Sequence, residues 1–224
     1  MPWIVGGIAA IGVIALLAFS LGVIPGFGPG GNAAPAPTVD VSRLHPPAAT
    51  PLADPPAEPA GDGTRATIET ELGTIVMELY TDSSPVAAAN FINLAEAGFY
   101  NGVVFHRIVP AFVIQGGDPE GTGGGGPGFE IQDDPVVGEY IRGAVAMARP
   151  ANRDGSLIPD SQGSQFFVVL ADDVAQRLPK SGGYSVFGKV VEGMDVVDRI
   201  ALGPVSNQQA LDPVVMTRIT VQRP

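Results

Sequence analysis

Residues 105–118 of the chain are Phe-His-Arg-Ile-Val-Pro-Ala-Phe-Val-Ile-Gln-Gly-Gly-Asp. Two short apolar runs, 103–107 and 112–115, lie on either side of the turn former Pro110, and a pair of glycines follows them. Short apolar runs between proline and glycine breaks are typical of β-strands joined by tight connections. The segment therefore predicts two strands, the first of which carries Arg107.

Two other stretches complete the pattern: Gly-Ser-Gln-Phe-Phe-Val at 163–168 and Tyr-Ser-Val-Phe-Gly-Lys at 184–189. Together with residues 105–118 they resemble the cyclophilins, which are peptidyl-prolyl cis-trans isomerases. The resemblance covers most of the chain from about Thr64 to the end. It implies a mainly β fold: a closed, eight-stranded antiparallel barrel with a helix over each end.

The local patterns predict an element order that agrees with this resemblance. Residues 66–70 and 73–79 predict a first β-hairpin. Residues 83–98 predict a helix, because they begin with an N-cap serine and a first-turn proline and end with glycine. Residues 194–202 predict a second helix, which Gly203-Pro204 stops. The remaining strands are expected at 143–148, 165–170, 185–190 and 214–222.

The N-terminal segment has no ionisable side chain between Trp3 and Ile24. A run of this length can cross a bilayer as a helix. A secretory signal peptide is the alternative, but no Lys or Arg precedes the run and no small-residue cleavage site follows it at once. We expect residues 1–25 to be an uncleaved single-pass membrane anchor with the domain on the extracytoplasmic side. Cleavage within 25–37, followed by secretion, is the alternative.

Residues 26–63 are dense in Pro, Ala and Gly and contain few large apolar side chains. Such a segment cannot bury a core of its own, so we expect a disordered, partly extended linker. The isomerase-like domain is then expected at 64–224.

Charge and composition exclude several classes of function. The net charge is −11, from 12 Lys plus Arg against 23 Asp plus Glu, which argues against nucleic acid as a partner. The chain has no cysteine, which excludes disulfides, thiolate zinc ligands and thiol catalysis. We expect a monomer without metal or cofactor, whose partners are proline-containing polypeptides and, through the anchor, the membrane.

Rotation of an X-Pro bond must break amide resonance against a barrier of about 18–20 kcal/mol. The reaction needs no nucleophile and no proton transfer. A site assists it by favouring the twisted amide, with a donor directed at the proline nitrogen, an apolar slot for the ring and exclusion of water.

Arg107, Phe112 and Gln115 are the candidate catalytic residues. Arg107 matches the catalytic arginine of cyclophilins, and its guanidinium stays protonated and offers a rigid fork of N–H groups. The structural alternatives are an arginine paired with an acidic neighbour and a phenylalanine that only packs in the core. Gln115 matches a pocket glutamine that can hydrogen-bond the substrate carbonyl.

The candidate substrate-binding residues match positions that line the cyclophilin proline pocket, an adjoining pocket and the strand that holds an extended peptide. They are Val113, Ala148, Arg149, Pro150, Gln165, Phe167, Leu178 and Tyr184. The glycine-rich stretch 121–128 lacks the Lys-Ser/Thr of a phosphate-binding loop, so we interpret it as a wall of the pocket.

The chain departs from the better-known cyclophilins at several of these positions. Arg149 and Pro150 stand where many relatives have Asn then Ala, and the following stretch 151–162 is longer than in compact members. Tyr184 replaces a histidine and Arg177 replaces a tryptophan. Tyrosine keeps a ring and a donor, so we expect activity to survive that change. Arg149, Pro150, Arg177 and the longer stretch give the alternative of a peptide-binding or chaperone module with weak or no isomerase activity.

Overall fold

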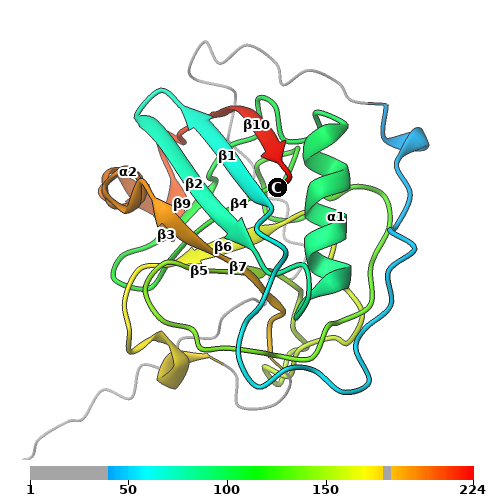
Figure 1. Cartoon of the computed structure of the whole chain (residues 1–224). Helices are drawn as coiled ribbons and strands as arrows, with labels where there is room; N and C mark the ends of the chain where they lie inside the picture. Colours follow the sequence, from blue (N-terminus) through cyan, green and yellow to red (C-terminus); the bar gives the residue numbers. More distant parts are fainter. Residues whose placement is uncertain (1–39, 179–182) are drawn as a thin grey trace, which may run out of the picture.

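The structure is a computed structural model that describes residues 40–178 and 183–224. Its elements are mostly short strands, accompanied by two α-helices and two short 3-10 helices (Figure 1). In chain order they are η1 (Val41–Arg43), β1 (Arg65–Thr70), β2 (Gly73–Leu79), α1 (Pro85–Glu96), β3 (Arg107–Val109), β4 (Val113–Gly116), β5 (Ala144–Met147), β6 (Phe166–Val169), η2 (Val174–Arg177), β7 (Val186–Glu192), α2 (Met194–Ala201), β8 (Val205–Ser206), β9 (Gln209–Ala210) and β10 (Met216–Gln222).

The described strands form one sheet in the order β10-β1-β2-β7-β5-β6-β4-β3-β9-β8. The mainly β fold with two helices is confirmed, but the expectation of a closed barrel of eight strands is wrong, because the sheet has ten strands and is open. The small hairpin of β8 and β9 pairs with the edge of β3. The segment before β3 instead meets β10 through a bridge between Val104 and Val215.

Strands β3 to β6 are buried at every residue. Alternate side chains of a strand point to opposite faces, and here the two faces enter two different apolar clusters. Ile108, Ile114 and Val168 belong to the larger cluster, which also contains the buried sides of α1 and α2. Val109, Val113 and Val169 belong to a smaller cluster on the other face. Burial on both faces explains why these strands are continuous apolar runs in the sequence.

The larger cluster is built around aromatic rings that join α1 to the sheet. The ring of Phe91 on α1 lies 5.1 Å from Tyr100, 5.5 Å from Phe166 and 5.2 Å from Phe187, measured between centroids. The Tyr100 hydroxyl donates to the carbonyl of Ser164 at 3.0 Å, so this buried phenol is hydrogen-bonded. Offset and edge-on ring pairs of this kind stabilise a core beyond the area that they bury.

Helix α1 begins at Pro85 after the N-cap Ser84, but the Ser84 side chain does not cap it. Its hydroxyl donates instead to the carbonyl of Val186 at 2.7 Å. The cap comes from a distant loop: the Asp134 carboxylate accepts the N–H groups of Val86 at 3.2 Å and of Ala87 at 2.8 Å. Burial raises the pKa of Asp134 more than these two bonds lower it. The loop before β5 is thereby fixed to the start of the helix.

Part of the segment expected as a linker lies against the domain. Leu44 packs on the larger cluster. Ala60 exchanges hydrogen bonds with the hydroxyl of Ser83, at 3.1 Å and 3.2 Å, and the N–H of Asp62 donates to Thr81 Oγ1 at 2.9 Å. A Cβ at Gly61 would lie 2.1 Å from the carbonyl oxygen of Leu79, so the backbone passes directly over the end of β2. The boundary at residue 64 stays a prediction.

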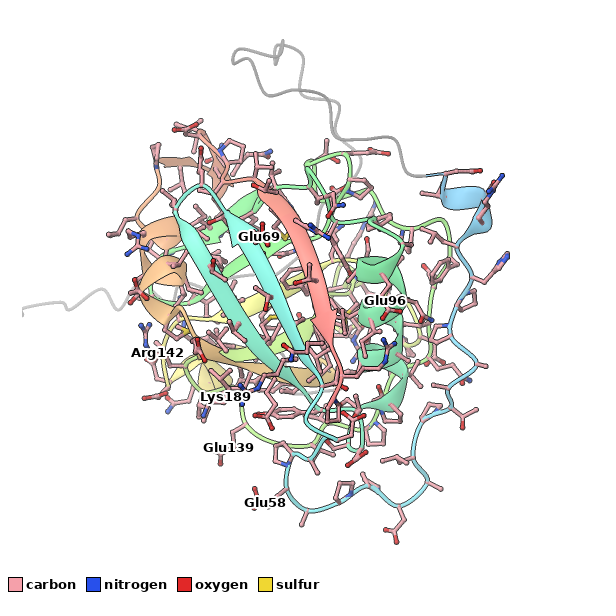
Figure 2. The ribbon with its side chains drawn as sticks, turned by 45° about the horizontal axis from the view of Figure 1, so that its top comes forward. Glu58, Glu69, Glu96, Glu139, Arg142 and Lys189 are labelled. Atoms are coloured by element: carbon pink, nitrogen blue, oxygen red, sulfur yellow. The ribbon has the colours of Figure 1, made fainter. Side chains whose placement is uncertain are left out.

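The expected hairpin, both α-helices and most of the remaining strands are confirmed to within about two residues at each end. The expected strand at 103–107 is displaced, because regular pairing begins only at Arg107. The expected anchor at 1–25 lies outside the described residues, and within 40–178 and 183–224 no helix has the length and apolar character to span a bilayer. Charged side chains such as Glu69, Glu96 and Lys189 project outward from the domain (Figure 2).

We predict that Asp134→Ala lowers the free energy of unfolding by about 1–2 kcal/mol, because it leaves two buried N–H groups of α1 without an acceptor. Asp134→Asn retains an acceptor oxygen and should lose less. Urea denaturation measures both changes. Asp82→Ala, which removes an exposed carboxylate just before the same helix, is the control and should change stability by less than about 0.5 kcal/mol. Wild-type stability of Asp134→Ala would contradict this account of the cap.

Candidate active site

The strand register brings the predicted site residues to one face of the sheet. Arg107 on β3 lies opposite Gln115 on β4, Gln115 lies opposite Phe167 on β6, and Phe167 lies opposite Ala146 on β5. Directly opposed residues project to the same face, and Val113 shares that face because it lies two residues from Gln115. This is the face that carries the smaller apolar cluster.

Seven residues surround a narrow slot on this face, which in this structure is too tight to admit a water molecule. Its apolar walls are Val113, Ala148, Phe167, Leu178 and Tyr184, and its polar end is formed by Arg107 and Gln115. The structure thus brings together seven of the predicted site residues. The lining, apolar with aromatic walls and a single hydrogen-bonding end, matches the chemical character of a small saturated ring attached to an amide, which could enter once the walls move apart.

Arg107 has no acidic partner in the described part of the chain. Its Nη1 donates to Gln115 Oε1 at 3.1 Å, while Nε and Nη2 donate to Gln208 Oε1 at 3.0 Å and 2.6 Å. The residue is 8% exposed, and burial lowers the pKa of its guanidinium, which still remains charged at neutral pH. The alternative of an arginine paired with an acidic neighbour therefore does not describe this site.

A chain of amides extends from Arg107 to the glycine-rich loop. Gln115 Nε2 donates to Gln165 Oε1 at 2.9 Å, and Gln165 Nε2 donates to the carbonyls of Gly123 and Gly125 at 3.0 Å and 2.9 Å. The loop is held from its other side by Asp118, whose carboxylate accepts backbone N–H groups of residues 120, 122 and 123. The side-chain amides of Gln115 and Gln165 thus each have a fixed orientation.

The glycine-rich loop forms one wall of a wider groove beside the slot, with a volume of about 680 Å³. Gln165, Arg149 and Pro150 also line this groove, together with Arg107 and Gln115, which it shares with the slot. A Cβ at Gly125 would lie 2.1 Å from Asp118 Oδ1, so the loop can approach this carboxylate only with glycine at that position. The predicted role of the loop as a pocket wall agrees with this placement.

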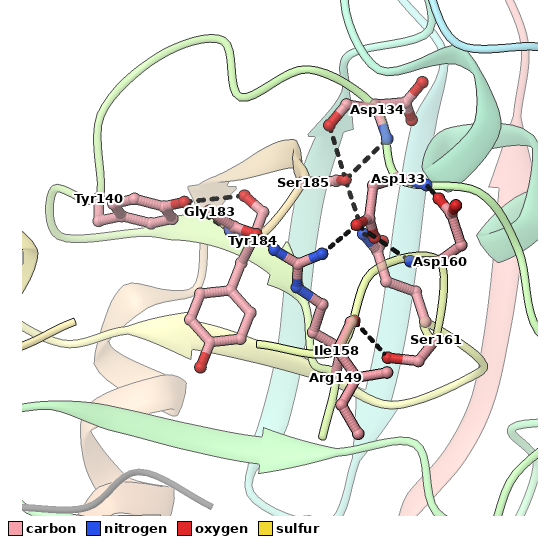
Figure 3. Close-up of polar contacts among 11 residues, drawn as sticks. Asp133, Asp134, Tyr140, Arg149, Ile158, Asp160, Ser161, Gly183, Tyr184 and Ser185 are labelled. Carbon is pink, nitrogen blue, oxygen red and sulfur yellow. Dashed lines mark hydrogen bonds and ion pairs between the residues drawn. The ribbon is translucent and has the colours of Figure 1, made fainter. Parts of the chain in front are cut away.

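Arg149 is 5% exposed, and its guanidinium is engaged away from the slot (Figure 3). Nη1 pairs with Asp133, and Nη2 donates to the carbonyl of Gly183. The other oxygen of Asp133 accepts from Gln162, so the ion pair joins three separate loops. The side chain of Arg149 therefore connects the loops beside the slot, whose walls it does not itself form.

The strand expected to hold a peptide is mostly occupied by the sheet itself. Strand β5 pairs with β6 on one edge and β7 on the other. The N–H of Ala148 donates to the carbonyl of Gln165 at 2.8 Å, and the carbonyl of Pro150 accepts from Ile158 at 3.0 Å. Pro150 has no N–H group, so it offers no backbone donor to a peptide.

Tyr184 forms another wall of the slot and packs edge-on against Phe167, with 5.2 Å between ring centroids. Its backbone is held by the Tyr140 hydroxyl, which bonds both the N–H and the carbonyl of Tyr184. Burial raises the pKa of Tyr184 to about 12. The hydroxyl thus stays protonated and can donate to a ligand in the slot.

Phe112 differs from the other predicted site residues, because it does not line the slot. It is fully buried in the smaller cluster behind Val113. The Arg177 guanidinium lies 4.3 Å from the centre of its ring and donates to the carbonyl of Ala111 at 2.8 Å. In this arrangement Phe112 supports the slot from behind, and Arg177 covers it from outside.

Gln208 was not predicted from the sequence, although it supplies two of the three hydrogen bonds to Arg107. It lies with Asn207 in the two-residue turn between β8 and β9. Asn207 is a common turn residue and indicates the turn, but nothing in the sequence connects the turn to Arg107. That connection depends on the backbone pairing of Arg107 with Gln209.

Solved structures with this architecture include a cyclophilin type peptidyl-prolyl cis-trans isomerase of Cryptosporidium parvum. The TM-score is 0.63 with 29% sequence identity, over 72% of this chain and 98% of that one. A second crystal structure of that protein, obtained in the presence of the dipeptide Ala-Pro, has a TM-score of 0.63 with 30% identity, over 71% of this chain and 99% of that one.

Sequence comparison gives relatives with consistent names. Peptidyl-prolyl cis-trans isomerases of Helicobacter pylori and Acinetobacter baylyi are 41% identical over 145 residues and 42% identical over 156 residues. These matches cover 62% and 64% of this chain and 82% and 74% of the relatives. The human peptidyl-prolyl cis-trans isomerase-like 1 is 41% identical over 146 residues, which cover 63% of this chain and 81% of that protein.

Residues 65–221 match the family described as "Cyclophilin type peptidyl-prolyl cis-trans isomerase/CLD". This range contains every residue of the slot, including Arg107 at its polar end. The chain therefore belongs to the cyclophilin-type peptidyl-prolyl cis-trans isomerases, the enzymes that accelerate rotation about X-Pro bonds.

Proposed function

We propose that the protein isomerises X-Pro bonds in extended segments of exported polypeptides, with the proline ring in the slot and Arg107 at the amide. The observation that carries the proposal is the buried, charged guanidinium at the polar end of an apolar slot, held only by amide oxygens among the described residues. A carboxylate partner would offset the positive charge. Amide oxygens orient the guanidinium and leave that charge for the substrate.

The chemistry follows from how the electrons of the amide change during rotation. When the amide twists, resonance is lost and the lone pair returns to the proline nitrogen, which becomes a hydrogen-bond acceptor. A donor at that position binds the twisted state more tightly than the planar state, and only this difference lowers the barrier. Each tenfold increase in rate requires about 1.4 kcal/mol of such preference.

The remaining slot residues restrict the motion of the substrate. Val113, Phe167 and Leu178 would hold the proline ring, while the Gln115 amide beside Arg107 would bond a neighbouring carbonyl of the peptide. The rest of the chain could then turn about the held proline. The fixed donor at Arg107 supports catalysis over the alternative of a module that only binds peptides, because a binding site gains nothing from a group directed at the twisted amide.

We predict that Arg107→Ala lowers kcat/KM for an Ala-Pro peptide at least about a hundredfold, because it removes a charged, largely buried donor from the site. Arg107→Lys keeps the charge but not the rigid fork, and should recover only part of the activity. A protease-coupled isomerisation assay measures these rates. Arg199→Ala, on the exposed face of α2, is the matched control and should retain wild-type activity. The isomerase function is rejected if wild type and Arg107→Ala both give the uncatalysed rate.

We further propose that residues 1–25 anchor the protein in the cytoplasmic membrane, with the domain on the outer side, where it assists the folding of exported proteins. The support is the absence of any ionisable side chain between Trp3 and Ile24. The Pro, Ala and Gly-rich segment that follows has the composition of a spacer between bilayer and domain.

For the anchor, we predict that the full chain sediments with membranes and resists alkaline extraction. Replacing Leu16 and Leu17 with Arg should release it, because each charge at the centre of a spanning helix costs about 2.5–3.5 kcal/mol. Ser42→Arg, outside the apolar run, is the control and should leave the protein in the membrane fraction. Recovery of wild type in the soluble fraction without Trp3 would show a cleaved signal peptide and overturn the anchor.

A further inference from the structure

Gln208 holds the catalytic guanidinium from the side that Gln115 does not reach. Its Oε1 accepts both Nε–H and an Nη2–H of Arg107, at 3.0 Å and 2.6 Å. Gln115 accepts from Nη1 at 3.1 Å. Arginine carries five N–H groups, of which three are bonded here. The two that remain, one on Nη1 and one on Nη2, have no acceptor among the described residues and are available to a ligand.

The backbone of Gln208 is in a conformation that a side chain disfavours. Asn207 and Gln208 have φ angles of 49° and 69°, and both are central residues of the two-residue turn between β8 and β9. Positive φ at both central residues is typical of a type I′ turn, whose twist matches that of a hairpin, and glycine is the relaxed choice at its second position. This chain has glutamine at that position, although a residue with a Cβ is disfavoured in the left-handed conformation.

Within the described structure, the polar contacts of the Gln208 side chain are its two hydrogen bonds with Arg107. The turn is anchored separately, because the backbone carbonyl of Gln208 accepts the N–H of Ile108 at 2.8 Å. A change of side chain can therefore remove the acceptor without removing the anchor. Strained backbone that persists beside a catalytic group indicates that the side chain serves the site rather than the fold.

We infer that Gln208 is a positioning residue for the isomerase reaction: its side-chain oxygen fixes the plane of the Arg107 guanidinium so that the two free N–H groups point at the substrate amide. The inference rests on the proposed role of Arg107. Gln208 does not touch the reacting atoms and acts through Arg107 alone. Without it, the guanidinium is held only at Nη1 and can turn about that bond, which lowers the fraction of molecules with a correctly directed donor.

Two substitutions separate this role from a structural one. Gln208→Gly removes the acceptor and relieves the strain, so we expect a higher melting temperature together with a kcat/KM about tenfold lower than wild type. Gln208→Met removes the acceptor but keeps the strain, so we expect the same loss of kcat/KM without the gain in melting temperature. In both variants the dissociation constant of an Ala-Pro peptide should change by less than about twofold, since the slot walls are intact.

Asn207→Gly is the matched control, because it relieves strain in the same turn without a contact to Arg107. It should raise the melting temperature and leave kcat/KM unchanged. A residue with a merely structural role would show activity and stability moving together across the three variants. Wild-type kcat/KM in either Gln208 variant, or an equal loss of kcat/KM in Asn207→Gly, would overturn the inference.

A second readout does not depend on activity. In a proton–nitrogen correlation spectrum, the Arg107 Nε–H of the wild type should exchange slowly with solvent, and this protection should disappear in Gln208→Gly and Gln208→Met. Retained protection in those variants would show that Gln208 does not hold the guanidinium. Lost protection alongside a wild type without isomerase activity would instead contradict the proposed function and leave the contact itself established.

Discussion

The site depends on a buried guanidinium that has no counter-ion in the described part of the chain. Burying a charge costs free energy unless hydrogen bonds replace the water that it loses. At Arg107 the replacement comes from the side-chain oxygens of Gln115 and Gln208. Neutral acceptors orient the cation without cancelling it, so the molecule keeps a fixed positive donor beside an apolar slot.

The surrounding strands and loops hold the residues of the site in place. The register of β3, β4 and β6 sets Arg107, Gln115 and Phe167 side by side. Gln165 ties the amide of Gln115 to the glycine-rich loop, and Asp118 holds that loop from behind. On the far side of the slot, the ion pair of Arg149 with Asp133 fixes Gly183 and therefore the start of the segment that carries Tyr184 (Figure 3). Polar networks of this kind stabilise a single arrangement only when their members are bonded.

Much of this could be predicted from the sequence, for identifiable reasons. The helices and the first hairpin follow from caps, breakers and apolar periods, and the residues of the slot follow from short stretches around Arg107, Phe167 and Tyr184 that resemble cyclophilins. Strands buried on both faces could be located as apolar runs. Such runs do not determine which residues pair across neighbouring strands, and β3 begins several residues later than expected.

What could not be predicted depends on contacts between residues far apart in the chain. Gln208 meets Arg107 because the β8–β9 hairpin pairs with the edge of β3, in a sheet that is open where a closed barrel was expected. Arg149 also lines the groove, but the direction of its guanidinium depends on Asp133, which lies on another loop. Phe112 matches a pocket position in sequence, yet Arg177 covers it. In each case the side chain has two possible neighbours, and only the folded chain selects between them.

The most direct test of the central claim is a crystal structure of the protein with a bound Ala-Pro peptide. The account predicts the proline ring between Val113, Phe167 and Leu178, with an Arg107 N–H group within about 3.5 Å of the prolyl amide and both glutamine contacts retained. A peptide bound only in the wider groove beside the glycine-rich loop, or an Arg107 guanidinium turned away from the prolyl amide, would contradict it.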